Sequence, residues 1–141
     1  VVQVQTYHVA DVGGHIETDS NAFQDSGAAV TITPQFSNSL IVCDFVTSMS
    51  CVSKASTEGL VTRLLLNNVM YGDIYTTGYT IRSNDTNNNY QPTTFKTVHS
   101  NLAAGTPVEF NVQFRAYTSG QQVLLAYEKS SITMTLTEIA Q

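Results

Sequence analysis

Two stretches near the C-terminus, VEFNVQFRA at residues 108–116 and SITMTLTEI at residues 131–139, decide the fold. In both stretches apolar and polar residues alternate, and the apolar positions are Val108, Phe110, Val112, Phe114, Ala116, Ile132, Met134 and Leu136. Successive side chains of a strand point to opposite faces, so each stretch has one apolar face and one polar face. This pattern is typical of antiparallel strands that cover a core on one side only.

The rest of the chain repeats this signal in short segments separated by turn residues, with no helical period. The predicted strands are Val2–His8, Ala28–Thr33, Leu40–Ser48, Leu60–Asn67, Val69–Tyr75, Tyr79–Arg82, Thr93–His99, Val108–Tyr117, Gln122–Tyr127 and Ser130–Ile139. The longest predicted loops are Asp11–Asn21, Met49–Gly59 and Ser83–Gln91. Regular short strands with such turns predict an all-β sandwich or barrel that forms a single domain over residues 1–141.

Composition excludes several kinds of partner. The 141 residues include 42% hydrophobic and only 12% charged side chains, with a formal net charge of −5. The six Lys and Arg residues are scattered and form no basic patch, so we expect no nucleic acid partner. No apolar run approaches the ~18–20 residues of a membrane span, so we expect no membrane insertion. The polar but weakly charged composition fits an extracellular or virion β-domain.

Two predicted strands, Leu40–Val46 and Leu60–Leu66, are apolar on both faces, and each carries one charge near its middle. The second face needs a cover, which is another subunit, a long loop, or the neighbours of a doubly covered central strand. A buried charge is costly unless it is paired, so we expect Asp44 and Arg63 to be partners of each other or of groups across an interface. Asp44, Arg63, Leu64 and Leu66 are therefore the interface candidates.

Four segments, in order from the first residue to the last, resemble a pattern of marine bacteriophage virion proteins. These are VVQVQTYHV at 1–9, AFQDSGAAVTITPQFSNSLIVCDFVTSM at 22–49, EGLVTRLLLNNVMYGD at 58–73 and SSITMTLTEIAQ at 130–141. The opening run resembles the passage from a fibre shaft into a head domain. The segments ADVGGHIETDSN at 10–21 and SNDTNNNYQ at 83–91 follow no pattern of this family.

The resemblance implies the C-terminal head of a phage tail fibre or virion spike, a jelly roll similar to the trimeric heads of the complement and tumour-necrosis-factor superfamily. It implies a homotrimer, contacts with other virion proteins, and a longer fibre protein of which this chain is the C-terminal part. The implied function is host attachment through a surface glycan or an outer-membrane receptor. The implied location is the virion, at the tail fibre. Alternatives are a capsid decoration protein with the same trimeric jelly roll, and a free carbohydrate-binding lectin module.

The polar segment around residues 83–90 is the candidate binding tip. Asn and Asp side chains pair with sugar hydroxyls, and tyrosine rings supply flat apolar platforms. The candidates are Tyr71, Tyr75, Tyr79, Asn84, Asp85, Asn87, Asn88, Asn89 and Tyr90. The alternative is an ordinary solvated loop, because runs of Asn favour turns.

We expect no catalytic residues, no cofactor and no metal centre, since the chain has no nucleophile elbow and no repeat of a polysaccharide-degrading β-helix. His15, Glu17 and Asp19 share one face if their segment is extended, which makes them weak metal candidates against a plain polar loop. His8 or His99 gathered around a trimer axis is a further metal alternative. Cys43 and Cys51 are expected as two free thiols, with a disulfide as the alternative.

Overall fold

The computed structural model describes residues 1–10, 16–51, 59–71, 79–80, 89–126 and 131–141. In this part of the chain all regular structure is β-strand, as the sequence predicts. One sheet contains β1 (Gln3–Val9), β2 (Ile16–Thr18), β4 (Leu40–Cys51), β8 (Asn89–His99), β10 (Val123–Leu125) and β11 (Ile132–Ile139). The other contains β3 (Gln24–Ile32), β5 (Leu60–Leu66), β6 (Val69–Met70), β7 (Tyr79–Thr80) and β9 (Val108–Ala116).

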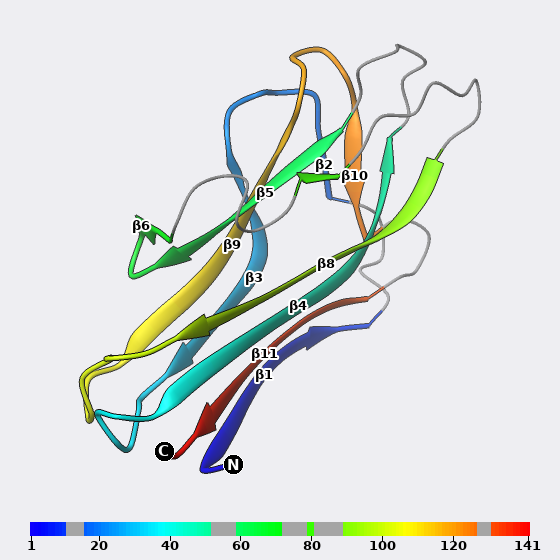
Figure 1. Cartoon of the computed structure of the whole chain (residues 1–141). Coiled ribbons are helices and arrows are strands. Elements are labelled where there is room, and N and C mark those ends of the chain that lie inside the picture. The colour runs from blue at the N-terminus through cyan, green and yellow to red at the C-terminus, as the bar shows by residue number, and fades with distance from the viewer. Residues whose placement is uncertain (11–15, 52–58, 72–78, 81–88, 127–130) are drawn as a thin grey trace.

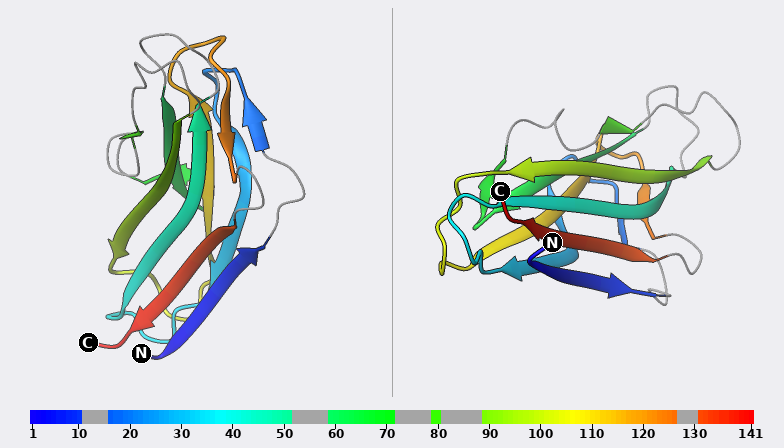
Figure 2. Two further views of the ribbon diagram at one scale, coloured as in Figure 1. Left: turned by 90° about the vertical axis from the view of Figure 1, so that its right-hand side faces the viewer. Right: turned by 60° about the horizontal axis from the view of Figure 1, so that its bottom comes forward.

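The two sheets face each other as a sandwich, and every strand pair is antiparallel (Figures 1 and 2). The larger sheet runs β1-β11-β4-β8, with β10 and β2 extending it beside the far end of β4. The smaller sheet runs β3-β9-β5, with β6 and β7 pairing two ends of β5. Strands distant in the chain thus pair within each sheet, in the orders β1-β11-β4-β8 and β3-β9-β5, which is the double Greek-key order of a jelly roll. The predicted fold class is confirmed.

The alternating sequence fills the space between the sheets. Along β9 every second side chain is buried, from Val108 to Ala116, and β11 follows the same rhythm from Ile132 to Leu136. The largest fully buried rings, Phe45, Phe110 and Phe114, come from both sheets. Each buried apolar side chain of this size contributes about 1.5–3 kcal/mol. Alternation with period two therefore accounts for both the strands and the core.

Turn residues supply the unusual backbone angles. Asn67 and Asn68 both have positive φ (47° and 65°) and join β5 to β6, as a two-residue hairpin turn of type I′ requires. Gly27 has a φ of 80° inside β3, where the register with β9 shifts between Asp25 and Ala29. This bulge turns the first residues of β3 away from the regular ladder.

A buried carboxylate joins both ends of the chain. Glu138 of β11 is fully buried, and its Oε1 atom accepts hydrogen bonds from the backbone amides of Gln35 and Phe36 (2.8 and 3.2 Å). The hydroxyl of Ser39 donates to the same oxygen at 2.6 Å, and the side-chain amide of Gln3 donates to Oε2 at 2.7 Å. Burial raises the carboxyl pKa, but the four hydrogen bonds outweigh it and hold the pKa of Glu138 below its usual value.

The strand predictions fail mainly at the boundaries and in one loop. The predicted loop Asp11–Asn21 contains the short strand β2. The predicted loops Met49–Gly59 and Ser83–Gln91 also lose residues, because β4 continues to Cys51 and β8 begins at Asn89. These polar ends become strands because they pair with each other over the full length of β4, which local sequence does not reveal.

Candidate functional site

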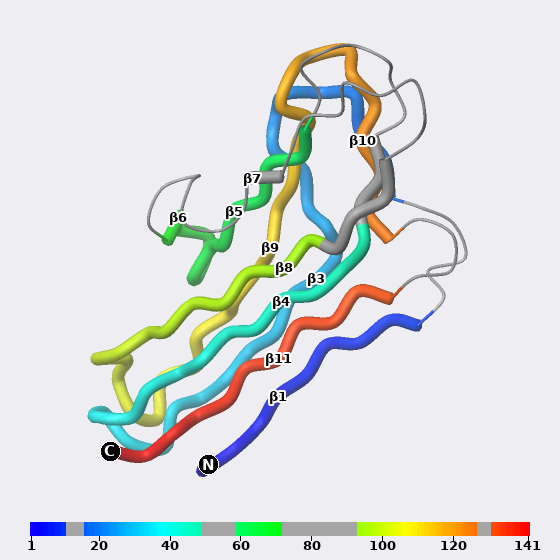
Figure 3. The backbone as a smooth tube through the Cα atoms, turned by 45° about the vertical axis from the view of Figure 1, so that its right-hand side comes forward, coloured from blue at the N-terminus to red at the C-terminus, as the bar shows by residue number. Residues whose placement is uncertain are grey.

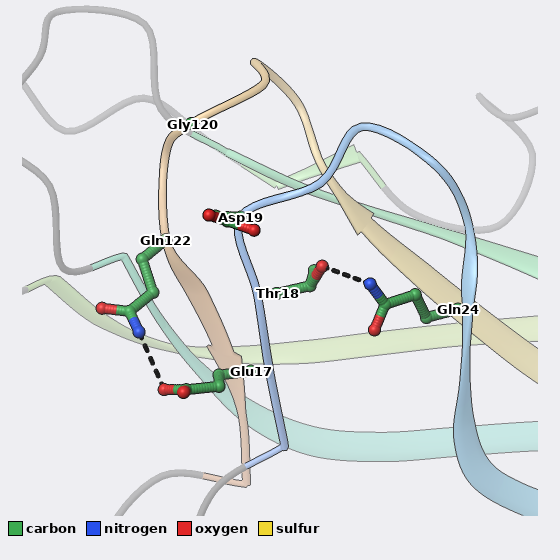
Figure 4. Close-up of a pocket in the computed structure, with 6 residues that line it drawn as sticks. All are labelled: Glu17, Thr18, Asp19, Gln24, Gly120 and Gln122. Atoms are coloured by element: carbon green, nitrogen blue, oxygen red, sulfur yellow. Dashed lines mark hydrogen bonds between the residues drawn. The ribbon is translucent and has the colours of Figure 1, made fainter.

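A polar pocket lies at one end of the sandwich, around the end of the edge strand β2 (Figure 4). Its volume of about 430 Å³ falls within the ~300–1,000 Å³ usual for small-molecule sites. The described residues that line it are Glu17, Thr18, Asp19, Gln24, Gly120 and Gln122. None of them carries an apolar side chain, so the pocket is suited to a hydroxylated or charged ligand rather than an apolar one.

One wall of the pocket bridges the two sheets. Thr18 ends β2 in the larger sheet, and Gln24 begins β3 in the smaller sheet, ahead of the bulge at Gly27. The side-chain amide of Gln24 donates a hydrogen bond to the buried Thr18 hydroxyl at 2.6 Å. The backbone amide of Ser20 donates to the same oxygen at 3.1 Å. Because its hydroxyl is held from two sides, Thr18 fixes the orientation of Gln24.

The other wall comes from the β9–β10 connection. The side-chain amide of Gln122 donates a hydrogen bond to Glu17 Oε2 at 2.8 Å. Between the two walls lies Asp19, which is exposed, and its carboxylate makes no hydrogen bond or ion pair with the described residues (Figure 4). Two carboxylates thus share one pocket with two amide side chains.

Backbone hydrogen bonds lock the two loops that carry these side chains. The amide of Gly120 donates to the Asp19 carbonyl at 2.7 Å, and the amide of Ala116 donates to the Ser20 carbonyl at 2.9 Å. Gly120 has a φ of 81°, a conformation that glycine adopts without the steric cost of a Cβ atom. The pocket is therefore built by residues close in space and about a hundred positions apart in sequence.

The predicted tyrosine cluster does not assemble as one tip. Tyr71 packs its ring against His99, with centroids 4.2 Å apart, near the C-terminal end of β8. Tyr90 lies at the other end of β8, nine residues from His99, which is about 30 Å along an extended strand. The prediction that Tyr71 belongs to the same tip as Tyr90 is wrong, because Tyr71 contacts the C-terminal end of β8 and Tyr90 lies near its N-terminal end.

The remaining tip candidates divide into two groups. Asn89 and Tyr90 belong to β8, and Tyr79 belongs to β7. Outside the described residues lie Tyr75, Asn84, Asp85, Asn87 and Asn88.

The weak metal set is only partly described. Glu17 and Asp19 do meet at the pocket, whereas His15 lies outside the described residues. Among the described residues no group of three or more His, Cys, Asp or Glu side chains is placed to hold a metal ion. Glu17 and Asp19 therefore enter the site as acceptors and charges of a polar pocket. Thr18, Gln24, Gly120 and Gln122 were not candidates from sequence, and only Gly120, a glycine between the predicted strands Val108–Tyr117 and Gln122–Tyr127, gave a local signal.

Asp44 and Arg63 are not partners of each other, because they lie in different sheets. Asp44 pairs with Lys96 across β4 and β8 at 3.1 Å, and both side chains are largely exposed. Arg63 donates through Nε to Gln113 Oε1 at 2.8 Å, and its guanidinium lies 4.1 Å from the centre of the Phe23 ring. Leu64 is fully buried in the core of its own chain, and Leu66 is partly buried against the same core, so neither is a free interface residue.

The larger sheet leaves its outer face uncovered. Cross-strand rows on the outer face of β8, β4, β11 and β1 place Val98, Val42, Thr137 and Val4 side by side, and further along Thr94, Val46, Thr133 and His8. The row between them is Lys96, Asp44, Thr135 and Thr6. Figure 3 shows these four strands side by side in one layer. Val4, Val46 and Val98 are about half exposed. The only opposite-charge pair on this face among the described residues is Asp44 with Lys96, which neutralises itself.

Buried reactive groups face the core instead of the pocket. Cys43 is a free, fully buried thiol, and burial raises its pKa to about 12. A Cys43–Cys51 disulfide within the chain is excluded, because eight residues of extended β4 separate them by about 26 Å, against less than ~7 Å for a disulfide. His99 is buried between the Tyr71 and Phe110 rings, and burial lowers its pKa to about 4. A buried position next to Phe110 does not suit the axial metal site that was an alternative for His99.

No protein-family model matches this sequence, and no curated protein matches it. In the described ranges no helix has the length and apolar character that crossing a bilayer takes.

Proposed function

We propose that this protein is the receptor-binding head of a phage tail fibre and holds a host-surface glycan in the pocket at the end of β2. One observation carries the proposal: the segments that line the pocket, β2 with the start of β3 and the β9–β10 connection, lie towards the end of the sandwich opposite to both chain termini (Figure 1). A head attached to a shaft through its N-terminal end would then present the pocket outward. The resemblance of four ordered segments to phage virion proteins supports the same assignment.

The uncovered outer face of the larger sheet supports a homotrimer. Half-exposed valines on a flat, nearly uncharged sheet face are unusual for a monomer and favour burial against another copy. Three linked copies would carry three pockets on one rigid head. Linked sites raise effective affinity by ~10²–10⁴ without new contacts when they bind together. Weak recognition of a repeating surface polymer then suffices for attachment.

The pocket favours attachment over capsid decoration, because a decoration protein needs no ligand site on its distal end. A free lectin would share the pocket, so the two assignments differ in what the termini are attached to. Gold-labelled antibody against the head, applied to phage particles that carry this chain, should decorate the distal tail tips. Label on the capsid would favour decoration instead.

Binding to purified surface polymers tests the attachment function. Arrays of bacterial lipopolysaccharides and capsular polysaccharides are incubated with the labelled protein. At least one polymer should retain it, and the double variant Asp19→Asn/Gln122→Ala should lose at least tenfold in retention. Glu109→Gln, which makes the same charge change on β9 of the smaller sheet, outside both the pocket and the outer face of the larger sheet, is the matched control and should bind like the parent. Retention by no polymer, or equal retention of the double variant, would overturn the proposal.

A further inference from the structure

The pocket at the end of β2 has a chemical bias that narrows its ligand. We infer that it selects a sugar residue bearing a protonated amine, and discriminates against anionic sugars. This inference rests on the proposed function, since it takes the pocket to be the glycan site. The argument uses the hydrogen-bonding state of the lining residues and their charge.

The hydrogen bonds that build the pocket use one N–H of each glutamine side chain and leave amide and carboxylate oxygens available to accept from a ligand. Gln24 gives an N–H to the Thr18 hydroxyl, and Gln122 gives an N–H to the Glu17 carboxylate. The Gly120 backbone N–H is already bonded to the Asp19 carbonyl. The amide oxygens of Gln24 and Gln122 accept no hydrogen bond from the other described lining residues, and the Asp19 carboxylate accepts none from the described residues (Figure 4).

An acceptor-rich pocket selects a ligand that is rich in donors. A carboxylate accepts hydrogen bonds only, whereas a sugar hydroxyl donates one and an ammonium group donates three. A ligand with several hydroxyls and one ammonium would therefore satisfy Asp19 and both amide oxygens together. Among the described lining side chains, a ligand carboxylate or phosphate would find donors only in the second N–H of each glutamine and in the Thr18 hydroxyl, and it would lie beside two carboxylates.

Charge acts in the same direction. The described lining residues include Glu17 and Asp19 and no Lys, Arg or His. Opposite charges about 4 Å apart near a protein surface gain enough to change affinity by about fivefold or more, even with strong solvent screening. Hydrogen bonds between a charged donor and a charged acceptor are also stronger than neutral ones. The ammonium group is therefore expected to bind at Asp19, whose carboxylate makes no hydrogen bond or ion pair with the described residues.

The pocket is preorganised for this task. Hydrogen bonds within the protein already fix the loops that line the pocket. They involve the Thr18 hydroxyl, the Gly120 amide and the Ser20 carbonyl. A wall already held by its own hydrogen bonds loses little conformational freedom when a ligand binds. The bulge at Gly27 and the positive φ of Gly120 are the backbone features that bring the two walls together.

Titration with four monosaccharides tests the inference on the full chain. ¹⁵N-labelled protein is titrated with D-glucosamine, N-acetyl-D-glucosamine, D-glucose and D-glucuronate, at a pH where the amine is protonated. Amide shifts at Asp19 and Gly120 should saturate with glucosamine at about fivefold lower concentration than with the acetylated or neutral sugar. Glucuronate should bind weakest. Higher ionic strength should reduce the difference in affinity between glucosamine and glucose, because salt screens the charge of Asp19.

Matched variants and a polymer separate the possible outcomes. Asp19→Asn should reduce glucosamine affinity to the level of glucose, whereas the control Glu109→Gln on the smaller sheet should leave it unchanged. Oligomers of glucosamine that bind more tightly than the monomer would identify a polymer as the source of the ligand. If glucose and glucosamine bind equally, the amine preference is overturned and the glycan site stands. If no sugar shifts the pocket amides, the inference and the proposed glycan pocket both fail.

Discussion

Strands β4 and β5 look alike in sequence and differ in what covers them. Both are apolar on both faces, and both carry one charge near the middle. On β5 the outward side chains Val61 and Leu65 are only 1% and 5% exposed, so the chain itself seals that face. On β4 the outward Val46 is 49% exposed, and Asp44 meets solvent beside it. Of the covers that the sequence leaves open, another subunit is therefore not needed for β5, whereas for β4 it stays a proposal.

The difference shows what an apolar run does and does not encode. A second apolar face on a strand indicates that other residues bury it. Only the tertiary structure shows whether those residues belong to the same chain. The partners of the two central charges follow the same division. Arg63, on the sealed face, is tied to Gln113 and Phe23, whereas Asp44, on the open face, has only an exposed surface pair. Mutations matched across the two strands can break or sharpen this comparison.

The largest expected contrast is between Leu65→Ala and Val46→Ala in the isolated chain. Leu65 is buried by its own chain, so its truncation should lower the free energy of unfolding by about 2–5 kcal/mol. Val46 is half exposed, so its truncation should cost less than about 1 kcal/mol in the monomer. Denaturant unfolding at low protein concentration measures both. Equal losses for the two variants would contradict the assignment of sealed and open faces.

Acid should lower the free energy of unfolding by protonating His99, which is buried on the core side of the larger sheet. His99 has a folded-state pKa lowered to about 4 from 6.5, so between these values the unfolded chain binds more protons than the folded chain. Stability is therefore complete above about pH 6.5 and falls as the pH drops towards 4, by up to about 3 kcal/mol. His99→Phe should flatten this part of the stability profile, while His8→Gln on the exposed face should retain it. An unchanged profile in His99→Phe would show that another group is responsible.

Below that window Glu138 should add its own loss. Its folded pKa is lowered, so the stability that its hydrogen bonds provide is present above the unfolded pKa and disappears as pH falls through the folded value. Glu138→Gln should remove this most acidic part of the profile in the same unfolding series. If the variant keeps the same acid-induced loss below pH 4, the carboxylate is not its source.

The two central charges should differ by a smaller amount. Arg63→Met removes hydrogen bonds to Gln113 and a cation–π contact with Phe23, for a loss of about 1–3 kcal/mol. Asp44→Asn removes an exposed ion pair and should cost less than about 1 kcal/mol. Thermal unfolding of both variants at low and high salt makes the comparison. A larger loss from Asp44→Asn than from Arg63→Met would reverse the roles of the two faces.

Local pattern predicts the fold well wherever one face of a strand is buried. The alternation at 108–116 and 131–139 gave β9 and β11 with boundaries correct to within two residues, because period two and burial coincide there. The short strand β2 was missed, since three residues in a polar segment have no periodicity and pair only through β10. The predicted break between the strands Leu60–Asn67 and Val69–Tyr75 corresponds to the Asn67-Asn68 turn, whose positive φ angles suit asparagine.

The candidate site was largely beyond the reach of the sequence. Glu17 and Asp19 were noted for metal chemistry, but their neighbours Gln24 and Gln122 come from segments that only the sandwich brings together. Glutamine in a strand or loop gives no signal of its own until its hydrogen-bond partner is known. The predicted tyrosine cluster failed because closeness in sequence does not imply closeness in space. Tyr71 contacts His99 at the C-terminal end of β8, whereas Tyr90 lies near the N-terminal end of the same strand.

The oligomeric mass in solution, measured by light scattering for the parent and Val46→Asp, tests the open face of β4 most directly. The account predicts three times 15.3 kDa for the parent and 15.3 kDa for Val46→Asp, with circular dichroism and monomer unfolding of the variant unchanged. A parent protein that stays at 15.3 kDa at every concentration would contradict the burial of Val46 between subunits.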